Sequence, residues 1–260
     1  MCGRYAITAT AERIEQVFDA LWETASIDAE RGAGAAALAA SLAAVTLPRF
    51  NVAPTQMCPV VRAGADTSEA RDRSTKGGGR GGGETRIVSM MRWGLVPSWA
   101  DDPAIGNRLI NARVETAPSK PSFRSAWKKG RCLVPISHFY EWKKEGSRKQ
   151  PMAIRAAGED DLLALAGLWD SWRDGLRSFT ILTTEPNELL RSIHDRMPLI
   201  LPPERWSRWL DPGWSGPDGA EELAEWSKPA PKSLLRAYAV ATTVNSPRND
   251  SPECVAPVVA

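Results

Sequence analysis

The residue with the most distinctive chemistry in this chain is Cys2, which directly follows Met1. If Met1 is removed, Cys2 carries a free α-amine and a thiol on adjacent carbons, a pair that no internal residue offers. With ordinary pKa values of about 7.7–8.0 and about 8.5, both groups are partly in their reactive forms at cellular pH. Such a pair condenses with an aldehyde to an imine, which the thiol then closes to a five-membered thiazolidine ring. By position alone, an ordinary second residue is the commoner case.

A second group of polar residues lies in the segment 111–116. In an extended segment Asn111, Arg113 and Glu115 share one face, which is unusual because that face is then wholly polar. A solvated sheet edge explains this pattern as well as a functional site does. The segment alone therefore leaves both interpretations open.

Two further segments could supply acid–base groups. Glu141 stands among Phe139, Tyr140 and Trp142, and a carboxylate among aromatics is expected to have a raised pKa, as a general acid or base requires. The alternative is a strand with one polar residue turned to water. His194 precedes Asp195 and Arg196, and a loop histidine beside charges can titrate near neutrality, although a lone histidine is more often structural.

The composition excludes several classes of protein. Lys and Arg number 33 against 31 Asp and Glu, so there is no global basic signature and any contact with nucleic acid must be local. Four scattered cysteines and two histidines make a disulfide framework or a metal site unexpected, and no cofactor is implied. We expect His138 to be structural or at the surface. No apolar run is long enough for a membrane span, and no basic leader is present, so a cytoplasmic protein is expected.

The elements that must position these residues are mostly short strands. A strand over residues 4–7 precedes a helix that Thr8 or Thr10 can cap, with a buried stripe of Ile14, Val17, Phe18 and Leu21. Further strands are predicted over 87–91, 132–136, 138–143, 152–155, 162–167, 178–183, 199–201 and 236–244, and helices over 187–193, 203–210 and 220–226. Helices that are grouped rather than alternating with strands predict an α+β fold. We expect a single domain, residues 1–260, with a curved, largely antiparallel, barrel-like sheet flanked by helices.

Two stretches look like insertions in this domain. Residues 28–46 are rich in alanine and could either extend a helix or form a tolerated insertion. Residues 65–85 are dense in Gly, Ser, Arg, Asp and Thr and cannot bury enough surface to offset their ordering entropy. Their glycines lack the P-loop pattern of a phosphate cradle. We predict flexible insertions at 28–46 and 65–85.

Six short motifs, in order along nearly the whole chain, resemble the SOS-response-associated peptidase family, whose members shield abasic sites in single-stranded DNA. Each motif is weak alone, but the set including Cys2 is specific. The resemblance rests on the segments 1–4, 51–54, 93–97, 111–116, 139–142 and 194–198.

This resemblance implies a role for each matched residue. Cys2 would be the covalent nucleophile, Asn111 would hold the reacting group by hydrogen bonds, Glu141 would act as general acid–base near the α-amine, and His194 would assist opening of the sugar. The resemblance further implies that backbone phosphates are contacted by arginines and that a base stacks on an exposed aromatic side chain; the matching positions are Arg4, Arg113, Arg196 and Trp99.

The implied product is a thiazolidine crosslink between Cys2 and the ring-opened sugar of an abasic site, which protects the strand from cleavage. Crosslink reversal and a thiol peptidase activity are further reactions that the family implies. The expected partner is single-stranded DNA with abasic sites, bound by a monomer in the cytoplasm, or at the nucleoid in a bacterium. The rival hypothesis is an amide hydrolase with Cys2 as its N-terminal nucleophile, similar to glutamine amidotransferases.

Overall fold

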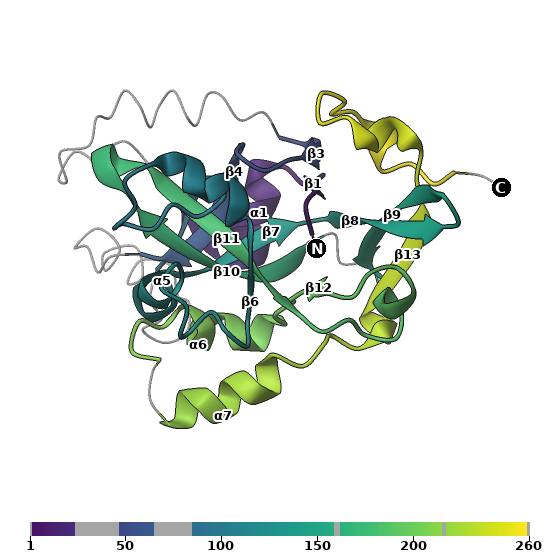
Figure 1. Ribbon diagram of the computed structural model, residues 1–260. Coiled ribbons are helices and arrows are strands. Elements are labelled where there is room, and N and C mark those ends of the chain that lie inside the picture. The colour runs from purple at the N-terminus through teal and green to yellow at the C-terminus, as the bar shows by residue number, and fades with distance from the viewer. Residues whose placement is uncertain (1, 24–46, 65–84, 159–161, 215–216, 259–260) are drawn as a thin grey trace.

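The strands of the larger sheet close into a five-stranded barrel (Figure 1). The computed structural model describes residues 2–23, 47–64, 85–158, 162–214 and 217–258. The barrel strands are adjacent in the order β11-β10-β7-β4-β5, and β5 returns to β11. Only the closing pair β5–β11 is parallel. The barrel strands are β4 (Met57–Ala63), β5 (Arg86–Trp93), β7 (Arg131–Ile136), β10 (Leu163–Ser171) and β11 (Arg177–Thr184).

Three short strands extend this barrel, and a second sheet stands beside it. β2 (Ala20–Trp22) pairs with β5, while β6 (Asn111–Arg113) and β12 (Met197–Pro198) pair with β11. The second sheet is antiparallel, in the order β13-β9-β8-β1-β3. Its strands are β1 (Tyr5–Ile7), β3 (Arg49–Val52), β8 (His138–Glu145), β9 (Arg148–Ala156) and β13 (Leu235–Ala239). Only Ser137 separates β7 from β8, so one nearly continuous stretch of strand joins the two sheets.

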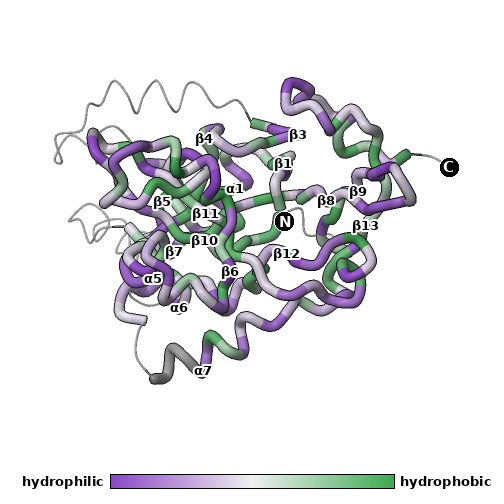
Figure 2. Tube along the Cα trace, in the orientation of Figure 1, coloured by the Kyte–Doolittle hydropathy of each residue, from purple (hydrophilic) through white to green (hydrophobic). Residues whose placement is uncertain are grey.

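Within the described residues, four α-helices flank the sheets: α1 (Ala11–Phe18), α5 (Arg124–Lys129), α6 (Trp206–Leu210) and α7 (Pro217–Trp226). The predicted fold class, α+β with a largely antiparallel, barrel-like sheet, is therefore confirmed. The hydropathy trace shows apolar segments in the barrel strands and polar segments along many outer loops (Figure 2). In the described part of the chain, no helix is both long and apolar enough to cross a membrane.

Several local predictions hold and others fail. Thr10 caps α1 by accepting a hydrogen bond from the backbone N–H of Arg13. The helix ends earlier than predicted because Asp19 adopts a left-handed conformation (φ 46°), so Leu21 lies in β2 with 42% of its surface exposed. The predicted helix over 187–193 is only a 3-10 turn at Leu190–Ser192. Residues 199–201 form no strand beyond a single bridge at Ile200, and the strand predicted over 236–244 is β13, which ends at Ala239. The insertion predicted at 28–46, and that at 65–85 except for Thr85, lie outside the described residues.

Trp93, at the end of β5, links the barrel to both strands that lead to the site. Its ring lies 4.9 Å from that of Tyr5 in β1, and its indole N–H donates to the carbonyl of Ile110, directly before β6. Gly94 follows with φ +115°, and a Cβ there would lie 2.5 Å from the carbonyl oxygen of Gly106. Position 93 therefore requires a large aromatic side chain to make both contacts, and position 94 requires glycine. Both the segment before Asn111 and the strand after Cys2 are fixed to the same buried indole.

Candidate active site

Cys2 lies three residues before the start of β1 at Tyr5 and is completely buried. Its backbone carbonyl accepts a hydrogen bond of 2.8 Å from Nδ2 of Asn111. Burial raises the pKa of the Cys2 thiol well above its ordinary value, and the nearby charge of Glu141 raises it further. The thiol is therefore neutral at cellular pH in this environment.

Asn111 is placed by the parallel pairing of β6 with β11, in which it stands opposite Ile181. Its Nδ2 is used by the Cys2 carbonyl, whereas its Oδ1 is buried and has no hydrogen-bond partner. A buried acceptor without a donor is costly, and such atoms are often completed by a ligand or water. Asn111 therefore has one half of its amide holding Cys2 and the other half available to a reacting group.

Glu141 lies on β8 and is 2% exposed. Successive strand residues point to opposite faces, so Glu141 lies on the face opposite to Tyr140, which packs in a separate apolar cluster behind the sheet. Burial raises the pKa of Glu141 to about 7. The predicted raised pKa is confirmed, with burial in the folded protein as its cause, since Tyr140 and Trp142 pack in the cluster on the other face. The alternative of a carboxylate turned to water is wrong. At neutral pH this group can either donate or accept a proton.

His194 follows the 3-10 turn and brings its ring toward Glu141, with 3.9 Å between Nε2 and Oε2 of the carboxylate. Its Nδ1 has two neighbours: the backbone N–H of Arg196 at 3.1 Å and Oδ1 of Asp195 at 2.8 Å. The Arg196 N–H requires a lone pair on Nδ1, whereas the Asp195 carboxylate requires a proton there, so a single protonation state cannot satisfy both neighbours. The N–H is fixed in the backbone, whereas the Asp195 side chain is 82% exposed and can turn to water. We therefore assign the lone pair to Nδ1 and the proton of the neutral ring to Nε2, which faces Glu141. Burial lowers the pKa of His194.

Two of the three arginines that the resemblance assigned to phosphates are engaged within the protein. Arg4 donates to Oδ1 of Asn51 at 2.8 Å and to the carbonyl of Val244 at 2.8 Å. Arg196 is buried and donates from Nη2 to Glu115 at 2.9 Å and to the carbonyl of Thr183 at 2.6 Å.

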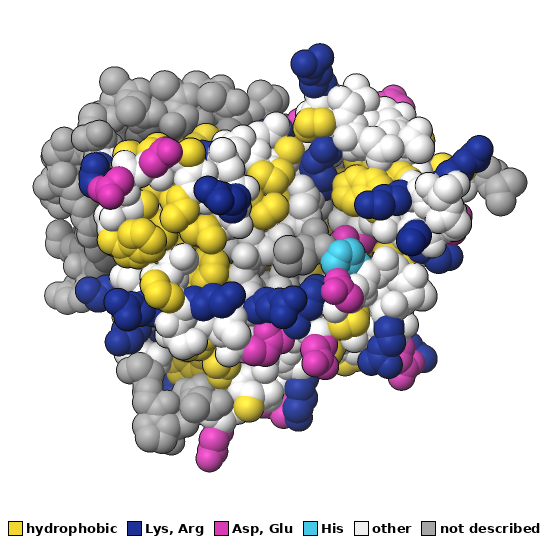
Figure 3. Space-filling model, viewed as in Figure 1, with side chains coloured by type: hydrophobic (Ala, Val, Ile, Leu, Met, Phe, Trp, Pro, Cys, Tyr) yellow, Lys and Arg dark blue, Asp and Glu magenta, His cyan; other side chains and the backbone are white. Residues whose placement is uncertain are grey.

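The third arginine and the tryptophan reach solvent. Arg113 is exposed on β6, two residues after Asn111. Trp99 is 55% exposed, and its indole N–H donates to the carbonyl of Pro121 at 3.3 Å, which fixes the ring at the surface. In one view of the surface, Lys and Arg side chains form a row across the middle of the face, below a histidine (Figure 3). This face has a local basic strip despite the near-neutral chain.

Sequence reasoning did not foresee the role of Asn51, which is completely buried. Its Nδ2 donates to the carbonyls of Val244, Ser246 and Asn249, while its Oδ1 accepts from Arg4. It thereby ties the C-terminal segment to Arg4, which lies between Cys2 and β1. The one signal in the sequence was its place in the motif 51–54, which gave it no role. Among the described residues, no three His, Cys, Asp or Glu side chains are grouped as a metal ion would need.

Several known proteins are similar to this chain in sequence or in fold. The chain is 43% identical over 178 residues to the abasic site processing protein YoqW of Bacillus subtilis (strain 168), covering 66% of this chain and 78% of that protein. It is 34% identical over 238 residues to the abasic site processing protein HMCES of Gallus gallus, covering 81% and 66%. A solved structure from Bacteroides thetaiotaomicron superimposes with a TM-score of 0.75 at 25% identity, covering 99% of this chain and 100% of that one. The profile described as SOS response associated peptidase (SRAP) matches residues 1–247, and the chain belongs to this family.

Proposed function

We propose that this protein processes abasic sites in single-stranded DNA by forming a covalent thiazolidine crosslink through Cys2. The single observation that carries the proposal is the convergence on Cys2: Asn111 holds its carbonyl, and the charge of Glu141 acts on its thiol. The relatives YoqW and HMCES are named as abasic site processing proteins, which supports the same substrate here.

The reaction requires that Met1 is removed, so that the α-amine of Cys2 is free. An abasic deoxyribose is mostly a closed hemiacetal, and a proton relay between His194 and Glu141 opens it to the aldehyde. With 3.9 Å between Nε2 and Oε2, a sugar hydroxyl beside the line joining them can bond to both. Ring opening transfers the proton of the anomeric hydroxyl away and returns a proton to the ring oxygen.

The covalent steps then follow from the amine. Its nitrogen attacks the aldehyde carbon to give a carbinolamine, and Glu141 in its protonated form donates a proton so that the hydroxyl leaves as water. The resulting imine carbon accepts the Cys2 sulfur, and the thiol proton moves to the nitrogen. The product is a thiazolidine with one new C–N and one new C–S bond, and the only atoms lost are those of water. Ring closure removes the electron sink that would otherwise promote β-elimination of the strand.

The raised pKa of the thiol fits this order of steps. A neutral, buried thiol is a poor first nucleophile, whereas the amine can attack first and deliver the imine to it. The same observation argues against amide hydrolysis, which needs a thiolate or an activated thiol at the start. The oxygen of Asn111 that has no partner would accept a hydrogen bond from the amine or the sugar.

Single-stranded DNA fits two exposed side chains, those of Trp99 and Arg113. Stacking of a base on an aromatic side chain contributes about 1–3 kcal/mol without sequence preference, and the exposed ring of Trp99 would offer such a face. Arg113 is the most accessible of the three candidate arginines and would contact a phosphate.

The test is to mix purified protein with abasic single-stranded DNA and to measure the intact mass before and after. We expect a protein that lacks Met1, and an adduct with the mass of both components less one water. Cys2→Ala should form no adduct, while Cys254→Ala, which changes a cysteine buried behind the sheet, should crosslink normally. Crosslinking by Cys2→Ala would overturn the proposal, and glutamine hydrolysis without DNA would favour the amide hydrolase.

A further inference from the structure

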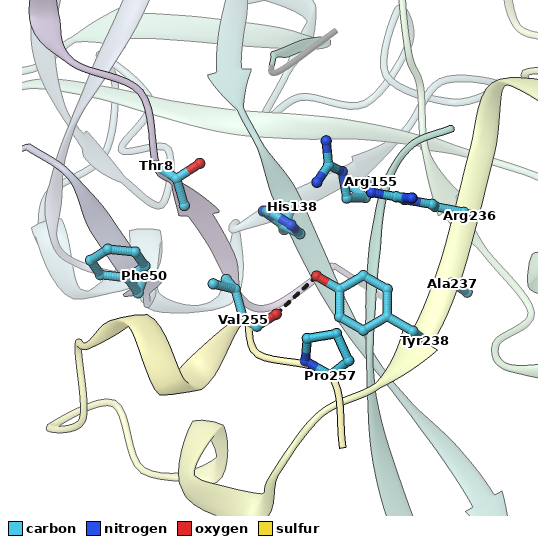
Figure 4. A pocket seen from close by; sticks show the side chains of 9 residues that line it. All are labelled: Thr8, Phe50, His138, Arg155, Arg236, Ala237, Tyr238, Val255 and Pro257. Carbon is cyan, nitrogen blue, oxygen red and sulfur yellow. Dashed lines mark hydrogen bonds between the residues drawn. The ribbon is translucent and has the colours of Figure 1, made fainter. Parts of the chain in front are cut away.

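A pocket of about 650 Å³ lies against one face of the second sheet (Figure 4). Its floor is formed by His138 of β8, Arg155 of β9 and Arg236 of β13. Phe50 and the C-terminal segment at Val255 wall its other side. Because His138 and Glu141 are an odd number of residues apart on one strand, they face opposite sides of the sheet. The pocket is therefore separate from the candidate active site.

The floor of the pocket is a row of basic side chains. The strand register places Arg236 directly opposite Arg155, and Arg155 directly opposite His138. Residues directly opposite on antiparallel strands have Cβ atoms about 4.5–5.5 Å apart, and like charges in such positions destabilise a sheet. The sheet thus carries a repulsive pair of arginines on its edge strand β13 and the neighbouring strand β9.

Neither arginine is neutralised by the protein. Among the described residues, no hydrogen bond or ion pair involves the guanidinium of Arg155 or that of Arg236, and no carboxylate lines the pocket. The burial of His138, together with the charges of both arginines, lowers its pKa to about 4. The pocket therefore has an excess of positive charge that its own walls do not balance.

The hydrogen bond of His138 to Ser137 uses one ring nitrogen and leaves the other available in this positively charged pocket. Ser137 Oγ donates to the carbonyl of Ala6 at 3.1 Å, so its proton is used there. It can then only accept from Nδ1 of His138, at 3.0 Å. The neutral ring thus has its proton on Nδ1 and its lone pair on Nε2. The histidine is 6% exposed, and no described residue is bonded to Nε2. An anion in the pocket would favour protonation at this nitrogen and gain a third donor.

We propose that this pocket binds a phosphate monoester with a flat apolar body about the size of a mononucleotide. Two adjacent guanidinium groups match the oxygens of a phosphate with parallel hydrogen bonds. Phe50 and the ring of Tyr238, whose hydroxyl is held by the carbonyl of Val255 at 2.9 Å, offer apolar faces for the body of the ligand. A volume of about 650 Å³ is within the usual range for small-molecule sites, about 300–1,000 Å³. The phosphate could belong to a free nucleotide or to the 5′ end of a DNA strand.

The experiment is calorimetric titration of the protein with deoxyadenosine 5′-monophosphate, with deoxyadenosine as the uncharged probe. We expect binding of the nucleotide only, weakened about 10-fold or more by Arg155→Gln or Arg236→Gln, because each removes a charged hydrogen bond. Arg148→Gln is the matched control, since Arg148 lies on the same strand, exposed and away from the pocket, and it should leave binding unchanged. Equal binding of the nucleoside, or equal loss in Arg148→Gln, would overturn the proposal, as would no binding of either probe and of a 5′-phosphorylated oligonucleotide.

The two histidines allow a second readout in the same protein. In ¹⁵N spectra of the imidazole rings, the nucleotide should shift the His138 signals toward the protonated form and leave those of His194 in place. Binding of a 5′-phosphorylated oligonucleotide, but not of the free nucleotide, would identify DNA ends as the source of the phosphate. Cys2→Ala should bind the nucleotide like the wild type, so a failure of the crosslinking proposal does not affect this test. A shift confined to His194 would contradict the assignment.

Discussion

The two faces of strand β8 carry ionisable groups whose pKa values are shifted in opposite directions. Glu141 faces the candidate active site, and burial raises its pKa to about 7. His138, on the other face, has its pKa lowered to about 4 by burial and by two arginines. Each group is therefore kept in its neutral form over part of the pH range in which it would be charged in water. Burial is the largest cause of both shifts, because it always penalises the charged form.

The difference lies in what surrounds each group. Around Glu141 are groups that can exchange protons, His194 at 3.9 Å and the thiol of Cys2, as acid–base chemistry requires. Around His138 are two arginines, whose positive charges lower its pKa and suit an anion rather than a proton transfer. A proton-transfer site and an anion-binding site can thus share one strand, because strand geometry alternates the side chains between faces.

The largest expected effect comes from Glu141→Gln, which should slow crosslinking about 10²–10⁴-fold. The neutral amine, needed for attack, favours high pH, and protonated Glu141, needed for loss of water, favours low pH. The wild-type rate should therefore peak between about pH 7 and 8. Without Glu141 the decline on the alkaline side should disappear. Rates are read from denaturing gels, and His138→Gln, on the other face of the strand, should retain the wild-type profile.

Asn111→Asp should slow crosslinking by about 10–100-fold, a smaller effect because the geometry is kept. The change removes the Nδ2 donor to the Cys2 carbonyl and places a carboxylate where the amide was neutral. The control is Asn107→Asp, since the exposed Asn107 keeps the oxygen that accepts from Arg92. Equal rates for the two variants would show that Asn111 does not hold Cys2 during the reaction.

The active-site face was accessible from the sequence, since its residues lie within short, recognisable segments. The aromatic neighbours of Glu141 predicted its raised pKa, and Thr10 was among the predicted helix caps. The predicted extent of the first helix was wrong for a local reason. The left-handed backbone at Asp19 ends α1 before Leu21, and nothing in the apolar spacing signals this.

The back face could not be predicted, because it depends on strand register. Arg155 and Arg236 lie on strands far apart in the sequence, and only the pairing of β8, β9 and β13 brings them beside His138. A shift of one residue would send each to the opposite face. The hydrogen bonds of Arg4 within the protein could not be predicted for a similar reason, since its partners Asn51 and Val244 lie in distant segments of the sequence.

The two faces should also differ in how stability depends on pH. Between pH 6.5 and about 4, unfolded His138 binds a proton that the folded protein refuses, so stability falls as the pH falls. The full loss is about 3 kcal/mol. For Glu141 the sign is opposite: between pH 4.5 and about 7 the folded state keeps a proton that the unfolded state releases, so stability falls as the pH rises. Urea unfolding should show that His138→Gln gains stability relative to the wild type as the pH falls from 7 to 5, because the opposing contribution of Glu141 is the same in both proteins. A constant difference between the two proteins over this range would contradict the lowered pKa.

The smallest effect expected is a gain in stability from Arg155→Gln. Relief of the repulsion between Arg155 and Arg236, which stand directly opposite, should raise the free energy of unfolding by about 0.2–1 kcal/mol. Arg148→Gln should do the reverse, because Arg148 stands opposite Glu145 and loses an attractive pair. Urea unfolding at low salt measures both changes in the free energy of unfolding. Addition of deoxyadenosine monophosphate should make the wild type more stable than Arg155→Gln. The ligand stabilises the folded wild type by mass action, and Arg155→Gln binds it less well. If Arg155→Gln is instead destabilising without ligand, the guanidinium contributes to the sheet itself, and the unbalanced charge of the back face is no longer a reason to expect an anion there.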